Sequence, residues 1–172
     1  KMAIASYNYN AIKVLEDLKL QGDGGSCLSI DSRGYWLKMS QNCYNKKFEI
    51  SCNQDFITTL LYSKSGGETV YVSSETHSSS SLGTTTEEIK AKCFKTGNGC
   101  DYEGSLWAAL ALQQTGHDVS IFIPYLIALA EDNKKYFSSA FLYIISGGDD
   151  MYSQIVQSQK QSKYWENVGS PY

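Results

Sequence analysis

Charged side chains are scarce in this sequence. They make up 19% of its 172 residues, and the net charge at neutral pH is only −3. Nucleic-acid-binding proteins need clustered lysines and arginines that neutralise phosphates and release counterions. The sequence has no such basic cluster, so we expect no nucleic-acid partner. With 42% hydrophobic residues, the chain can still build a packed core.

Long apolar segments are also missing. The longest, Val119–Ala130, is interrupted by Ser120 and Pro124 and is much shorter than the roughly 20 residues of a membrane-spanning helix. We therefore expect no transmembrane segment. The sequence opens on Lys1 without an initiator Met or an apolar leader, which fits either a processed mature chain or a recombinant fragment.

The close cysteine pairs and grouped histidines that zinc sites require are absent as well. Both histidines, His77 and His117, stand alone in polar surroundings. We therefore expect neither a metal ion nor a cofactor.

The cysteines that are present have a spacing that indicates disulfide bonds. Cys93 and Cys100 bracket Phe-Lys-Thr-Gly-Asn-Gly, whose glycines and asparagine allow the tight reversal that a bridge needs. Cys27, Cys43 and Cys52 can form one further bridge, which we assign to Cys43 and Cys52, although spacing alone leaves this pairing open. Disulfides require an oxidising compartment, so we expect a secreted or cell-surface protein.

Hydrophobic periodicity divides the chain into a strand-rich first half and a helical second half. Residues 11–20 carry apolar side chains at helical spacing, and 27–74 alternate with period two. Turns between the strands are predicted at Arg33-Gly34, Asn45-Lys46 and Gly66-Gly67. The Ser/Thr run 78–86 is interpreted as a linker or solvated loop open to O-glycosylation.

The second half of the sequence is predicted to form helices with short connecting loops. Thr85 and Glu88 form a capping-box pattern that predicts a helix over 87–94. Four more helices are predicted at 102–114, 120–130, 135–145 and 149–159. Their short joints favour antiparallel hairpins.

The fold class predicted from these patterns is α+β: a small antiparallel disulfide-stapled β unit and an array of helical hairpins. Three segments are expected: an N-terminal helix (1–26) that packs with the helical half, the β unit with its Ser/Thr-rich loop (27–84), and the helical-hairpin domain (85–172).

Two segments resemble a known repeat. Gln159–Trp165 and Gln21–Cys27 each follow a predicted helix and resemble the Q-x-x-x-G-x-W repeat of the squalene-cyclase and prenyltransferase superfamily. Lys163 replaces the glycine in the first copy, and Cys27 replaces the tryptophan in the second. The chain as a whole resembles uncharacterised archaeal secreted proteins in which a cysteine-containing β insert interrupts such helices. This resemblance implies a partial α/α toroid.

No catalytic constellation is found. Asp149-Asp150 lacks the first aspartate of the Asp-x-Asp-Asp acid of terpene cyclases, and a helix start explains it better. Gly99-Cys100 resembles the thioester site of complement-like domains, but Glu103 stands where a glutamine is needed. Glu87-Glu88 is interpreted as another helix start. We therefore expect no enzyme.

The function favoured by the sequence is a non-catalytic structural subunit of a cell-surface or filamentous assembly, with copies of itself as partners. The alternative is an extracellular module that binds glycan or lipid. A degenerate cyclase-superfamily enzyme is the third reading. Four aromatic residues at helical spacing are the candidate ligand-binding residues of the alternative: Trp107, Tyr125, Tyr136 and Tyr143.

Overall fold

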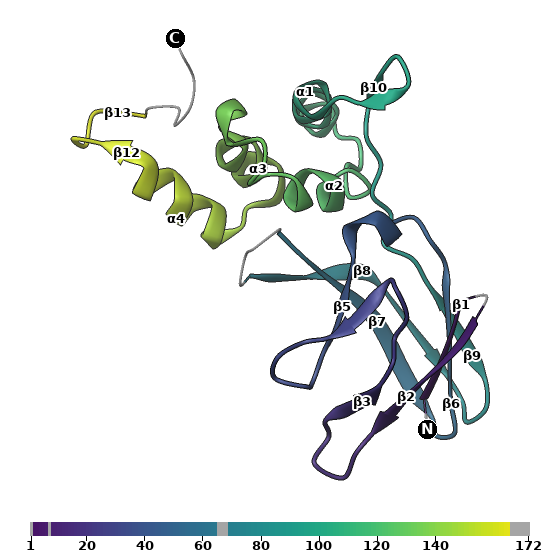
Figure 1. The fold of residues 1–172 in the computed structure, drawn as a ribbon. Coiled ribbons are helices and arrows are strands. Elements are labelled where there is room, and N and C mark those ends of the chain that lie inside the picture. The colour runs from purple at the N-terminus through teal and green to yellow at the C-terminus, as the bar shows by residue number, and fades with distance from the viewer. Residues whose placement is uncertain (1, 7, 65–68, 166–172) are drawn as a thin grey trace. The chain divides into compact units, whose positions relative to one another are not determined.

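The computed structural model describes residues 2–6, 8–64 and 69–165, and it divides the chain into two compact units. The first comprises Lys1–Tyr62 and Val70–Lys90 and contains the main sheet and two hairpins (Figure 1). The second comprises Ser63–Thr69 and Ala91–Tyr172 and is mainly helical. An α+β chain with a small antiparallel β part is thus confirmed.

The main sheet of the first unit has five strands in the order β3-β2-β1-β6-β9, all antiparallel to their neighbours. The strands are β1 (Met2–Ser6), β2 (Asn8–Val14), β3 (Leu20–Gly22), β6 (Phe48–Cys52) and β9 (Thr84–Glu87).

Two hairpins and a short 3₁₀ turn complete this unit. They are β4 (Leu28–Ile30) with β5 (Leu37–Met39), β7 (Phe56–Ser63) with β8 (Val70–Ser79), and η1 (Gln41–Cys43). The predicted turn at Arg33-Gly34 joins β4 to β5, where Gly34 has a φ of 83°. The turn predicted at Gly66-Gly67 lies outside the described residues.

The N-terminal helix predicted within 1–26 is wrong, because its apolar residues belong to β2, β3 and the turn between them. Ile12 is fully buried, while Val14, Leu15 and Leu18 are exposed. Leu18 has a φ of 65°, which no helix accommodates. The alternation of Ile12, Lys13 and Val14 also fits a strand. Pairing with β3 decides in favour of a strand over a helix.

The core of the first unit joins the sheet to the hairpins. Phe48 and Ile50 of β6 are buried while Glu49 between them is exposed, so one face of the sheet is turned inward. Buried residues from β2, the β4–β5 hairpin and the segment after β9 complete it: Ile12, Cys27, Leu28, Met39, Cys43 and Ile89. Side chains of β7 pack against this cluster, among them Phe56, Leu60 and Tyr62.

The disulfide inside this core differs from the predicted one. Cys27 pairs with Cys43, with Cα atoms 5.6 Å apart, and Cys52 is free. The assignment of a bridge to Cys43 and Cys52 is therefore wrong. Cys52 is the last residue of β6. Cys43 is the last residue of η1, which places it beside Cys27, the residue directly before β4. Cys93 and Cys100 are bridged, in the pairing that their spacing predicted.

The Ser/Thr-rich segment forms strands and a turn, and the segment predicted as a helix after it has no regular structure beyond Glu87. Residues up to Ser79 belong to β8, and Thr84–Glu87 forms β9. No helix forms over 88–94, where Ile89 is buried in the core. The side chain of Thr85 bonds to another threonine, Thr58, so it caps no helix.

The second unit contains four α-helices among the residues described, and α3 packs against the other three. They are α1 (Tyr102–Gln114), α2 (Ile123–Ala128), α3 (Ser138–Ser146) and α4 (Asp149–Ser158). Pro124 lies in the first turn of α2, as expected. The predicted third helix is divided into η2 (Lys134–Tyr136) and α3, because Phe137 between them has a φ of 53°.

Short strand pairs flank these helices. β10 (Lys95–Thr96) pairs with β11 (Gly99–Cys100) before α1, and β12 (Gln159–Lys160) pairs with β13 (Tyr164–Trp165) after α4. The core of the unit is formed by buried apolar residues of all four helices: Leu106, Ala109, Leu126, Ile127, Leu142 and Met151.

The two bridges predict a definite thiol count. Denatured but unreduced protein should react with one equivalent of a thiol reagent, at Cys52, and reduced protein should react at all five cysteines. Peptide mapping after alkylation checks the assignment. Labelling of Cys27 or Cys43 before reduction would contradict the structure.

Candidate functional site

The four aromatic residues proposed for ligand binding do not form one site. Trp107 lies edge-on to Phe141, with ring centroids 4.7 Å apart. Trp107 and Tyr136 line a shared hollow of about 200 Å³. Tyr125 and Tyr136 both lie beside Tyr102, with ring centroids 5.9 and 6.3 Å apart. Tyr143 lies beside another aromatic residue, Tyr152, on α4.

Tyr102 has a structural role in the same unit. Its hydroxyl donates a hydrogen bond to the backbone oxygen of Leu126, which ties α1 to α2. Burial raises the pKa of Tyr102 to about 12. The group therefore stays neutral over the physiological pH range.

A second hollow of the helical unit has a volume of about 450 Å³ and is bordered by Lys64. Sequence analysis did not identify this lysine. Lys64 Nζ lies 2.6 Å from a Glu131 carboxylate oxygen and donates to Gln154 Oε1 at 3.2 Å. Burial lowers the pKa of Lys64, and the negative charge of Asp150 opposes this effect. Because Lys64 is held in an ion pair, we interpret it as a structural residue.

The most developed polar cluster lies in the β unit, and its placement follows from the sheet register. Glu87 pairs with Phe48, and Thr85 pairs with Ile50. Cross-strand partners point to the same face of a sheet. The inward face is therefore apolar on β6 and polar on β9. Glu87 is only 2% exposed.

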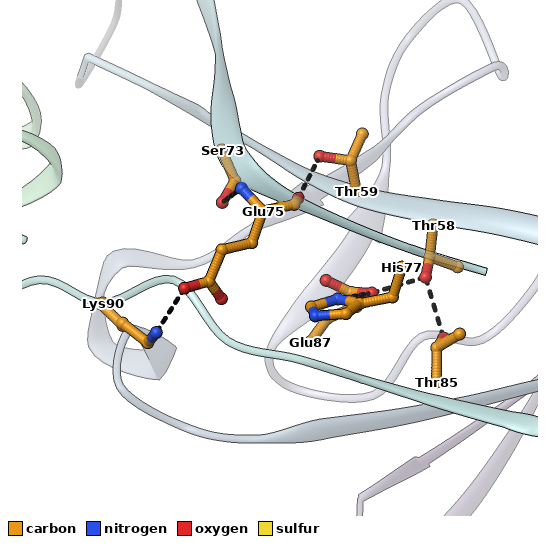
Figure 2. A network of polar contacts seen from close by, with 8 residues as sticks. All are labelled: Thr58, Thr59, Ser73, Glu75, His77, Thr85, Glu87 and Lys90. Carbon is orange, nitrogen blue, oxygen red and sulfur yellow. Dashed lines mark hydrogen bonds and ion pairs between the residues drawn. The ribbon is translucent and has the colours of Figure 1, made fainter. Parts of the chain in front are cut away.

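Side chains of β7 and β8 satisfy this buried carboxylate, as Figure 2 shows. Thr58 Oγ1 lies 2.5 Å from Glu87 Oε1 and 2.9 Å from Thr85 Oγ1. His77 Nδ1 lies 2.9 Å from the same carboxylate oxygen. A hydroxyl has one proton, so when Thr58 donates to Glu87 it accepts from Thr85. We call Thr58, His77, Thr85 and Glu87 the Glu87 network.

The Glu87 network orients a half-exposed imidazole but does not supply a nucleophile. When Nδ1 donates to the carboxylate, the other ring nitrogen is left as the acceptor. A Ser- or Thr-type nucleophile must hydrogen-bond to that second nitrogen. The hydroxyl of Thr58 bonds to the carboxylate itself, so its position does not match that role.

An exposed ion pair lies next to this network (Figure 2). Lys90 Nζ donates to Glu75 Oε1 at 2.5 Å, and Thr59 Oγ1 donates to the backbone oxygen of Glu75. The hydrogen bond from Lys90 lowers the pKa of Glu75 and burial opposes it. Such solvent-exposed pairs contribute little to stability.

An apolar hollow of about 390 Å³ is bordered by β7, the β4–β5 hairpin and the main sheet. Five successive residues of β7, 57–61, border it. Alternate residues of a strand point to opposite faces. A run of successive residues therefore presents both faces to the hollow, which places the hollow along the edge of β7. The hairpin and the sheet supply the rest of the lining: Leu20, Leu28, Tyr35, Trp36, Leu37, Met39, Phe48 and Ile50.

Sequence reasoning missed both features of the β unit. His77 and Glu87 were interpreted as a loop residue and a helix start, and they lie on β8 and β9 instead. The sequence Thr84-Thr-Thr-Glu87 has no alternation of apolar and polar residues, so it carries no local signal for a strand with a buried face. Nothing local indicates that β7 contributes a threonine to the carboxylate.

Within the described part of the chain, no three histidine, cysteine or acidic residues are placed to hold a metal ion. The same residues include no helix with the length and apolarity to cross a membrane. No protein-family model, curated protein sequence or solved structure matches this chain.

Replacing Thr58 tests the Glu87 network. Thr58→Val keeps the shape but removes the donor to a buried carboxylate, so the free energy of unfolding should fall by about 1–3 kcal/mol. Thr59→Val, on the exposed side of the same strand, is the matched control and should cost less than about 0.5 kcal/mol. Urea denaturation measures both.

A double variant identifies the partner. If the donor acts on the carboxylate, the cost of Thr58→Val should shrink in a Glu87→Gln background. Equal costs for Thr58→Val and Thr59→Val would contradict this account.

Proposed function

We propose that this protein is a non-catalytic structural subunit of an extracellular assembly built from copies of itself. The observation that carries the proposal is the apolar hollow along the edge of β7. Compact monomers rarely leave large connected apolar patches exposed, and such patches commonly mark protein–protein contacts.

The side chains around the hollow support this interpretation. Ile57 is 73% exposed and Trp36 is 56% exposed, and both line the hollow. Tryptophan and large aliphatic residues bury much area on association and are common at interface centres. In the described residues, β7 has only β8 as a strand partner, and an edge without a strand partner can pair with a strand of another chain.

The covalent structure and the polar cluster fit the same proposal. Disulfides at Cys27–Cys43 and Cys93–Cys100 favour an oxidising location outside the cytosol. In the Glu87 network, the threonine hydroxyls, the imidazole and the carboxylate hydrogen-bond to one another. Such internal bonding is typical of a structural network.

A charge placed at the hollow should disrupt association. Ile57→Lys should raise the dissociation constant at least tenfold, because burying an unpaired ammonium in an apolar contact is costly. Leu82→Lys is the control, since Leu82 is 80% exposed but does not line the hollow. Sedimentation velocity from 1 to 100 µM measures both. A wild-type chain that stays monomeric throughout would overturn the proposed function.

A second candidate function is glycan binding by the helical unit. Trp107 and Tyr136 share their hollow with Phe141 and with two charged residues, Glu103 and Lys135. Aromatic faces can pack against the C–H face of a sugar ring, while charged groups can bond its hydroxyls. This hollow combines two of the four predicted aromatics.

Replacing the exposed tryptophan tests this alternative. If the hollow takes a glycan, Trp107→Ala should lose at least tenfold in affinity for any ligand found on a glycan array, while Trp36→Ala should not. The two variants separate the helical hollow from the one along β7. Array binding that is unchanged in Trp107→Ala would exclude this hollow.

We also propose that the helical unit is related to α/α toroids, on the basis of the two residues that match their repeat. Gln159 and Trp165 are partners across the β12–β13 pair directly after α4. Trp165 Nε1 also donates to the backbone oxygen of Ile155 on that helix. A contact that joins the end of a helix to the following turn is consistent with a repeat element. An enzyme of the cyclase superfamily has no further support.

A further inference from the structure

Four polar side chains meet at the hollow of about 450 Å³ in the helical unit. Lys64 directly follows β7, Glu131 lies between α2 and η2, Ser139 is on α3 and Gln154 is on α4. All four belong to the second compact unit. Lys64 and Gln154 are in contact although 90 positions separate them in the sequence. The tertiary fold, and not local sequence, therefore brings these groups together.

The amine of Lys64 lies between a carboxylate and an amide. Its Nζ is 2.6 Å from Glu131 Oε2 and donates to Gln154 Oε1 at 3.2 Å. The Lys64 side chain is only 12% exposed. Burial lowers the pKa of Lys64, and the charge of Asp150 opposes this effect. Proton transfer along the short contact to Glu131 leaves a neutral amine, which is the nucleophilic form of lysine.

The amide of Gln154 is polarised by two donors on one oxygen. Ser139 Oγ donates to Gln154 Oε1 at 2.9 Å, and Lys64 Nζ donates to the same atom. A hydroxyl at a carbonyl oxygen stabilises the negative charge that develops there when a nucleophile adds to the carbon. The last torsion of a glutamine side chain is soft, so a rotation turns the carbonyl carbon toward the amine. Groups held about 3–3.5 Å apart react much faster than free groups.

Glu131 suits the role of proton acceptor and not that of the group that is attacked. An ionised carboxylate resists addition of an amine, because its negative charge is shared by both oxygens. Lys134 forms a second ion pair with Glu131, and a nearby cation favours the charged form of a carboxyl group. The neutral amide of Gln154 is therefore the better electrophile of the two.

We propose that Lys64 and Gln154 become joined by an intramolecular amide bond. Nζ forms a bond to Cδ of Gln154, and the bond from Cδ to Nε2 breaks. Ser139 donates to the developing oxyanion. Glu131 carries two protons from Nζ to the departing nitrogen, which leaves through the hollow as ammonium, and the carboxylate is regenerated. Nothing is oxidised or reduced and no co-reactant is needed. The bond goes beyond the proposed function and does not depend on association between copies.

The intact mass of the reduced wild-type chain tests the bond directly. Reduction opens both disulfides, so the remaining deficit against the sequence mass should be that of ammonia, about 17 Da. A chain with the full sequence mass would overturn the proposal.

Peptide mapping places the bond. Trypsin should release residues 48–90 joined to residues 136–160, because acylated Lys64 is no longer a cleavage site. A deficit that maps to Asn98-Gly99, where a succinimide forms with the same loss of ammonia, would overturn the proposal. A cross-link from Lys64 to Glu131 would overturn it as well.

Two lysine variants separate the reacting amine from an ion-pair partner. Lys64→Arg keeps the positive charge, but a guanidinium does not give up its proton, so this chain should have its full sequence mass. Lys134→Arg is the matched control, because Lys134 also pairs with Glu131 and borders the same hollow. It should retain the deficit. A loss of ammonia that persists in Lys64→Arg would overturn the proposal.

Variants of the assisting groups test their roles. Shortly after cell-free synthesis, the cross-linked fraction should be at least tenfold lower in Glu131→Gln, which lacks the proton acceptor, and in Ser139→Ala, which lacks the oxyanion donor. Gln157→Ala, on the same helix as Gln154 and at the same hollow, should cross-link like the wild type. Circular dichroism checks that each variant is folded. Unchanged cross-linking in Glu131→Gln and Ser139→Ala would overturn the roles assigned to them, and the wild-type mass decides the bond whether or not a variant folds.

Discussion

The bond between Cys27 and Cys43 is the constraint on which the β unit depends. It joins the start of the β4–β5 hairpin to the turn that leads into β6, and a backbone hydrogen bond from Ser40 to Cys27 lies beside it. Strands of three residues cannot hold a hairpin in place by themselves. With the hairpin fixed, Leu28 and Met39 stay in the core and Trp36 stays at the hollow.

Strand β7 contributes to both the Glu87 network and the apolar hollow. Thr58 points inward and hydrogen-bonds to a carboxylate, while its neighbour Ile57 is exposed at the hollow. The inward contact fixes the position and register of the strand. The border of the hollow on β7 is thus held in shape by a buried polar network as well as by the apolar core.

The helical unit could largely be predicted from the sequence, and the β unit only in part. Helix α1 has its N-terminal cap at Asp101, whose side chain accepts from the backbone of Gly104, and such signals are local. The residues of β2 and β9 carry no comparable local signal. Ile12 fits strand spacing with Val14 and helical spacing with Leu15. Thr85 and Glu88 match a capping box by sequence alone. Only the pairing of β2 with β3 and of β9 with β6 decides in favour of strands.

The two disulfides lie one in each unit, Cys27–Cys43 in the first and Cys93–Cys100 in the second. Neither bridge therefore crosses the boundary between the units. A protease that cuts the backbone between Lys90 and Ala91 would leave two fragments that no disulfide joins, each with its own bridge intact.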